Sequence, residues 1–283
     1  MKNIPLFWYS INKLKQRPNF FSKSYFNFLF KREKENYGDL LSKYLVEKIS
    51  GKKIRWYRPH LKPERNFFVI GSILNHSDCQ SIIWGSGIID RKHNVELAEV
   101  KAVRGPLTRL RLLELSIDCP EVYGDPALLL PRFHQLIKDK KHEIGIVPHY
   151  IDFDLINNLY KKDTNVRVIN LLTKDIKKTT NEIIECSYII SSSLHGLIIA
   201  HAYGIPAIWV KYSNNLYGDN VKFDDYLLSV NLKPYNEISI QTKLTLEEML
   251  DLIHQYDNLP DQSYIKELCD KLLKACPFEK SFS

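Results

Sequence analysis

The stretch Tyr188-Ile189-Ile190-Ser191-Ser192-Ser193-Leu194-His195-Gly196 joins a short apolar run to a segment that continues through Ala200 to Tyr203. A continuous apolar run bounded by small residues is typical of a buried parallel strand. Serines placed before a new apolar segment are typical of the start of a helix. The stretch therefore predicts a strand, a turn and a helix, which together are the repeating unit of an α/β fold.

Other apolar runs extend this pattern over most of the chain. They lie at 67–71, 82–85 and 97–103 and, after about residue 138, at 144–148, 166–169 and 206–210, with helical candidates around 175–186 and 194–203. Two consecutive series predict two Rossmann-like domains facing a cleft, with the boundary between 1–137 and 138–283. Apolar residues at helical spacing over roughly 245–275 predict helices at the end of the chain that pack against the rest of the protein. The first domain is one candidate surface for this packing.

The composition excludes several classes of protein. The chain has 283 residues, 44% of them hydrophobic, which is enough for a substantial core. Its 5 cysteines form no C-x-x-C pair, so reduced thiols are favoured over a disulfide framework. Since no apolar run approaches the roughly 20 residues that span a bilayer, we expect a cytoplasmic protein. The net charge of +7 favours anionic ligands, and we expect no nucleic-acid partner.

The segment 11–35 is unusual because it mixes basic residues with aromatic ones. The simpler interpretation is a helix that buries its aromatic side chains against the first domain and exposes its charges to solvent. The alternative is peripheral contact with the anionic inner face of a membrane, where each Lys or Arg contributes about 1 kcal/mol. The sequence leaves both interpretations open.

The turn at 191–196 is the strongest candidate for a functional site. The first N–H groups of a helix attract a phosphate or carboxylate, so we expect Ser192, Ser193 and Leu194 to bind substrate. His195 lies beside that position, where an imidazole can move a proton near neutral pH. The alternative for a lone histidine is a purely structural role.

Other candidates lie at strand ends and helix starts. Arg104 ends a predicted strand before Gly105-Pro106, and its guanidinium is suited to bind a carboxylate or phosphate. Asn36 and Asp39 can cap the helix predicted over 40–49, while Gly38 lets a ligand approach the backbone. The strand ends add Gly71, Ser72 and Gly85 to the expected substrate-binding residues.

We expect neither a nicotinamide cofactor nor a metal. The run Gly85-Ser86-Gly87-Ile88-Ile89-Asp90 begins like a dinucleotide-binding turn, but Asp90 stands where the third glycine belongs and would repel a pyrophosphate. His195 and His201 are six residues apart, a spacing that does not place two metal ligands on one helix face. The expected co-substrate comes from the resemblance below.

Several motifs in the same order and spacing resemble the polysaccharide pyruvyltransferase family over about residues 36–230. They are Asn36-Tyr37-Gly38-Asp39, Gly71-Ser72, Gly85-Ser86-Gly87, Arg104-Gly105-Pro106, Gly124-Asp125-Pro126-Ala127, and Ser193 to Gly196 with Tyr203 to Pro206. The resemblance implies a fold similar to that of the GT-B glycosyltransferases. It also implies phosphoenolpyruvate as co-substrate. The implied acceptor is a sugar of a bacterial surface polysaccharide or of its lipid-linked precursor, which would become a pyruvate ketal.

One departure from the family pattern concerns the expected anion site. Many members carry Arg two residues before the histidine, where this chain has Ser193. Arg104, the helix start after Ser193 and Lys211 are the candidates to hold the donor instead. With this donor, the expected catalytic residues are His195 as the general acid–base and Arg104, which would neutralise the charge of the donor. Two other functions stay open, namely a GT-B-type glycosyltransferase that uses a nucleotide sugar and a catalytically silent glycan-binding protein.

Overall fold

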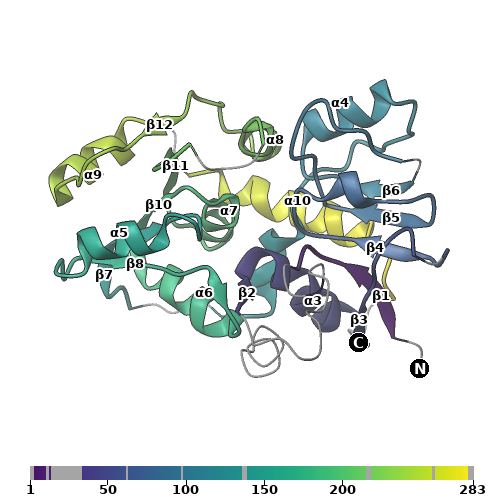
Figure 1. Cartoon of the computed structure of the whole chain (residues 1–283), viewed down its shortest axis with the longest axis horizontal. Helices are drawn as coiled ribbons and strands as arrows, with labels where there is room; N and C mark the ends of the chain where they lie inside the picture. Colours follow the sequence, from purple (N-terminus) through teal and green to yellow (C-terminus); the bar gives the residue numbers. More distant parts are fainter. Residues whose placement is uncertain are drawn as a thin grey trace, which may run out of the picture.

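The chain forms two parallel β-sheets flanked by helices, which confirms the predicted α/β class (Figure 1). This computed structural model describes residues 3–10, 13, 34–61, 63–96, 98–135, 139–214, 218–256 and 259–279. The strands of one sheet come from residues 4–102 and those of the other from residues 142–239. The two sheets therefore fall on either side of the boundary expected at 137/138.

The first sheet has five strands in the order β3-β1-β4-β5-β6, all parallel. Its strands are β1 (Ile4–Phe7), β3 (Ile54–Trp56), β4 (Asn66–Phe68), β5 (Ser81–Trp84) and β6 (Glu99–Ala102). Numbered by their place in the chain, these strands run 2-1-3-4-5, a doubly wound order. The chain reverses its direction of travel across the sheet between β1 and β4, so this is the switch point where such sheets bind ligands.

The second sheet repeats this topology. Its strands are β7 (His142–Val147), β8 (Val166–Val168), β10 (Cys186–Ser191), β11 (Ala207–Lys211) and β12 (Ile238–Ser239), in the order β12-β11-β10-β7-β8. All four pairings are parallel. By place in the chain the order is again 2-1-3-4-5, and the switch point lies between β7 and β10.

The helices connect the strands and cover the sheets. They are α3 (Tyr37–Ser50), α4 (Pro106–Glu114), α5 (Phe153–Tyr160), α6 (Ile176–Ile184), α7 (Leu194–Ala202), α8 (Val221–Ser229), α9 (Leu246–His254) and α10 (Gln262–Lys274), with the 3₁₀ turns η1 (Leu74–His76) and η2 (Pro126–Arg132). Helix α7 is buried from Leu194 to His201, so its sequence is apolar rather than amphipathic.

The sequence did not predict the two strands that begin the first sheet. Pro5 within the run 4–9 argues against a central strand, because proline cannot donate to the ladder. In the structure, β1 is nevertheless central, and its Leu6 and Phe7 are almost wholly buried. The strand β3 has three residues, and the central one is Arg55. It is therefore too short and too polar to be recognised as an apolar run in the sequence.

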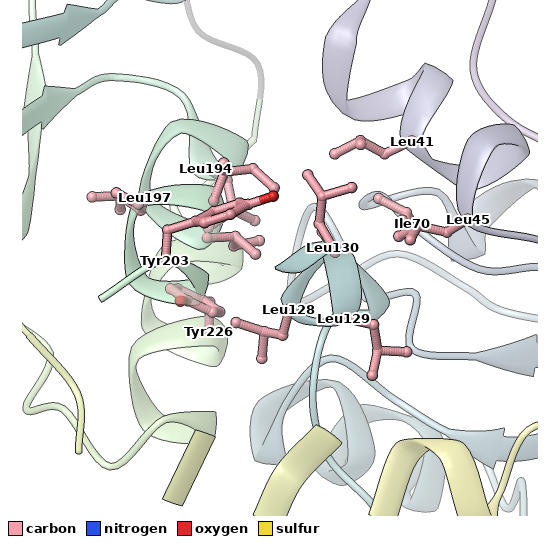
Figure 2. Close-up of a cluster of buried hydrophobic side chains, with 14 of the residues drawn as sticks. Leu41, Leu45, Ile70, Leu128, Leu129, Leu130, Leu194, Leu197, Tyr203 and Tyr226 are labelled. Atoms are coloured by element: carbon pink, nitrogen blue, oxygen red, sulfur yellow. The ribbon is translucent and has the colours of Figure 1, made fainter. Parts of the chain in front are cut away.

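One hydrophobic cluster joins the two halves. Figure 2 shows the side chains of Leu128, Leu129 and Leu130 in η2 between helix α7 and helix α3, and all of them belong to one buried cluster. A short antiparallel pair, β2 (Glu35–Asn36) with β9 (Leu172–Thr173), also joins the halves. The packing therefore fixes how the two sheets face each other.

The C-terminal helix α10 crosses from the second half to the first (Figure 1). The indole Nε1 of Trp84 in β5 donates to the carbonyl of Leu272 in α10 at 2.9 Å. Phe278, beyond the helix, packs against Phe67 and Trp84. These contacts tie the end of the described chain to the first sheet.

The segment 11–35 lies largely outside the described residues, which include only Lys13, Lys34 and Glu35 of it. Both interpretations of this segment, the packed helix and the membrane contact, therefore stay predictions. Among the helices that the structure describes, none is long and apolar enough to cross a bilayer.

Candidate functional site

One cavity lies at both switch points. Its volume is about 440 Å³, within the range of roughly 300–1,000 Å³ that is usual for ligand pockets. The lining residues that follow β1 and β4 are Tyr9, Ser10, Gly71, Ser72, Ile73, Asn75 and His76, and those that follow β7 and β10 are His149, Tyr150, Ile151, Ser193, Leu194 and His195. The carboxyl ends of both sheets therefore meet at a single cavity.

Helices α3, α7 and α8 all begin at this cavity. Asn36 is the N-cap of α3, Ser193 is the N-cap of α7, and Lys222 is the second residue of α8, and all three line the cavity. The start of a helix carries a positive partial charge and free N–H groups. Their convergence makes the cavity favourable for an anion. The remaining lining residues are Lys34, Glu35, Asp39 and Ile89.

The turn from β10 into α7 is held by serine hydroxyls. Ser191 Oγ donates to the carbonyl of Val147 at 2.9 Å, and Ser192 Oγ accepts the backbone N–H of His149 at 2.8 Å. These bonds join the ends of the two strands at the switch point. Ser193 is the N-cap of α7, but its side chain makes no capping hydrogen bond.

His195, predicted as catalytic, lies in the cavity wall with its imidazole almost wholly buried. Among the described residues none forms a hydrogen bond with its Nε2. Burial, reinforced by the positive charges of Arg104 and Lys222, lowers the pKa of His195 to about 3. The imidazole is therefore neutral at physiological pH, and its free nitrogen is available to a ligand.

Gly38 is needed because His195 packs directly against it. A Cβ built at this position would overlap the imidazole, with Cγ and Cε1 only 2.5 Å away. Gly38 does not itself line the cavity, so the structure places it behind the histidine. The open backbone that the sequence predicted here receives a side chain of the protein rather than a ligand.

Asp39, in the first turn of α3, is the buried carboxyl group of the cavity. Asn36 Nδ2 donates to Asp39 Oδ2 at 3.0 Å, so the sequence motif orients the carboxyl. Burial and the nearby Glu35 outweigh this bond and raise the pKa of Asp39 to about 7. Asp39 therefore exchanges a proton near neutral pH, which is the property of an efficient general acid–base.

Lys222 and His149 are cavity residues that the sequence did not single out. Burial, followed by the charge of Arg104, lowers the pKa of Lys222 to about 8. Burial, followed by the charge of Lys222, lowers the pKa of His149 to about 4. Since the charge of Lys222 also acts on His195, its ammonium lies electrostatically close to both imidazoles.

The structure places Arg104 beneath the cavity and not in its wall. Its side chain is fully buried; Nε donates to Asp225 Oδ2 at 2.9 Å and Nη1 to Ser72 Oγ at 2.6 Å. Asp225 also accepts the backbone N–H and the hydroxyl of Thr108. Arg104 thus supports the cavity residue Ser72 and ties the first half to α8.

Three other expected binding residues lie outside the lining. Lys211 Nζ pairs with Glu237 Oε1 at 2.8 Å, and Ser192 holds the backbone of His149 as described. Gly85 has a φ of +94°, and a side chain there would overlap Pro126. The structure does bring together Asn36, Asp39, Gly71, Ser72, Ser193, Leu194 and His195.

Some of the cavity residues that were not predicted could have been found from the sequence. His149 and Tyr150 directly follow the predicted strand 144–148, so the strand-end rule that selected Arg104 applies to them equally. Lys222 had no such signal, because the helix α8 that carries it was not among the helices predicted from the sequence. Within the described ranges, no three His, Cys, Asp or Glu side chains are grouped as a metal ion would require.

The fold and cavity define a doubly wound α/β protein whose two sheets share one cavity, at which three helices begin. The model of the polysaccharide pyruvyl transferase family matches residues 6–214, and the chain belongs to this family. Family membership supports a transferase that moves pyruvyl groups to polysaccharide. An uncharacterized protein of Acanthamoeba polyphaga mimivirus is 32% identical over 208 residues, which cover 68% of this chain and 70% of that protein. No solved structure matches the chain.

Proposed function

We propose that this protein transfers pyruvate from phosphoenolpyruvate to two hydroxyl groups of one sugar, forming a ketal. The observation that carries the proposal is the convergence of helix starts, a free imidazole and a lysine at the cavity between the sheets. Phosphoenolpyruvate carries a phosphate and a carboxylate, so this surrounding favours it. The two sheets with a cavity between them also agree with the expected GT-B-like arrangement.

Two cavity residues differ in their affinity for protons, as a reaction with both acid and base steps requires. Asp39 holds a proton up to a pKa of about 7, whereas His195 stays neutral because its pKa is lowered to about 3. We therefore assign the first proton donation to Asp39 and the first proton acceptance to His195. The sequence had suggested His195 alone for both roles.

The reaction then balances in protons and electrons. Asp39 gives its proton to the methylene carbon, and the electron pair of the C=C bond forms the new C–H bond. The first sugar hydroxyl attacks the cationic central carbon and passes its proton to His195. The second hydroxyl attacks as the C–O bond to phosphate breaks, and its proton restores Asp39. His195 returns its proton to the departing phosphate.

The test is phosphate release from phosphoenolpyruvate in the presence of a panel of methyl hexopyranosides, with the ketal methyl group followed by NMR. We expect sugar-dependent phosphate release. If no sugar of the panel causes phosphate release, and glycosyl transfer from a nucleotide sugar is observed, the glycosyltransferase is favoured. Glycan binding without any transfer would favour the silent binding protein. A bacterial source of the polysaccharide, a lipid-linked acceptor and a cytoplasmic location stay predictions.

Variants separate the two roles. Asp39→Asn and His195→Ala should each lower turnover by about 10²-fold or more, because each removes a proton-transfer group. Asp154→Asn is the matched control, since Asp154 is an exposed carboxylate in the first turn of α5. Near wild-type turnover in Asp39→Asn or in His195→Ala would remove that residue from the mechanism.

A further inference from the structure

Few side chains in the cavity wall carry a positive charge. The cations suggested by the sequence are already neutralised, because Arg104 pairs with Asp225 and Lys211 pairs with Glu237. Ser193 brings no charge to the start of α7. Of the described lining residues, Lys34 and Lys222 are the lysines, and Lys34 is exposed to solvent.

Lys222 differs from these cations because no described residue neutralises it. Its ammonium makes no hydrogen bond or ion pair with a described residue, and its packing contact is with the ring of Phe223 at 5.3 Å. A partly buried ammonium without an anion is disfavoured, as the lowered pKa of Lys222 reflects. A charged group with a perturbed pKa and no partner is typical of a ligand-binding site.

The position of Lys222 is fixed by the contact between the two halves. Asp225 lies one turn further along α8, where residues i and i+3 are neighbours. The buried carboxylate of Asp225 is held by Arg104 and Thr108 of the first half. A second anchor comes from Arg91, which bonds to Asp219 and Asp224 around the start of α8. These bonds hold the start of α8, and with it Lys222, at the cavity.

We propose that Lys222 is the cationic ligand for the phosphate group of the donor, with the free N–H groups at the start of α7 and the imidazole of His195 beside it. The assignment to phosphate rests on charge, because a dianion gains more from an unpaired ammonium than a monoanionic carboxylate does. This inference rests on the proposed function for the identity of the donor. The role of Lys222 can be tested by binding measurements alone, without turnover.

The experiment measures the affinity of the full chain and of Lys222→Met for three probes by calorimetry: inorganic phosphate, phosphoenolpyruvate and pyruvate. Loss of a charge-assisted hydrogen bond should weaken binding of phosphate and phosphoenolpyruvate at least tenfold and leave pyruvate nearly unchanged. Lys271→Met, on the exposed face of α10, is the control and should bind all three probes as the wild type does.

A stability measurement on the free variant guards against a merely structural effect. Removing an unpaired, partly buried charge should leave the unfolding midpoint of Lys222→Met equal to or above that of the wild type. Unchanged affinity for phosphate and phosphoenolpyruvate, or a loss confined to pyruvate, would overturn the proposal. A folded variant that loses phosphate while the wild type fails to turn over phosphoenolpyruvate would support the phosphate site and refute the proposed function.

Discussion

Replacing Gly38 by alanine tests the packing that exposes His195 to the cavity. The new Cβ would lie 2.5 Å from Cγ and Cε1 of the imidazole, about 1 Å inside ordinary carbon contact distances. Overpacking of this kind costs about 1–3 kcal/mol of unfolding free energy. The displaced imidazole should also lower turnover, since proton transfer depends on its position.

A double-mutant cycle isolates this clash. In the His195→Ala background the ring is absent, so Gly38→Ala should be neutral or should stabilise the helix α3 by up to about 1 kcal/mol. The two backgrounds should therefore differ by about 1–4 kcal/mol, measured by urea denaturation of the four proteins at pH 7.5. If Gly38→Ala has the same effect in both backgrounds, the described contact with His195 does not exist.

Two further predictions concern buried charge. Asp225→Ala leaves the Arg104 guanidinium without its carboxylate and should lower the unfolding free energy by about 3–5 kcal/mol, measured by urea denaturation. Asp224→Ala is the control, because it breaks a partly exposed pair with Arg91 and should cost about 0–1 kcal/mol in the same experiment. The pKa of His195 is lowered to about 3, so between pH 6.5 and 5 the unfolded chain takes up a proton that the folded chain does not. The wild type should therefore lose about 1.6 kcal/mol more stability than His195→Gln over this interval, and parallel pH profiles would contradict the burial of this imidazole.

The sequence predicts those parts of the fold that carry their own local pattern. The strand β10 and the helix α7 were predicted because an apolar run ends at serines and a second apolar segment follows. The strand β1 was missed because Pro5 contradicts the pattern, and only burial of Leu6 and Phe7 between neighbouring strands fixes it as a strand.

The candidate site shows the same division. Asp39 and His195 follow from helix starts and strand ends, which are local features. The environment of a predicted residue is not local: Arg104 was expected to face the donor, but its partner Asp225 is 121 residues further along the chain. The role of Lys222 depends on the same contact between halves, so it becomes visible only when α8 is placed in space.

The most direct test of the central claim is thermal unfolding of the wild-type protein with phosphoenolpyruvate, set beside UDP-glucose, UDP-galactose and GDP-mannose. A ligand at 100 times its Kd adds about 2.7 kcal/mol of stability, which is readily measured as a shift of the midpoint. We predict a shift with phosphoenolpyruvate, strongly reduced in Lys222→Met, and none with the nucleotide sugars. A shift with a nucleotide sugar and none with phosphoenolpyruvate would contradict the account.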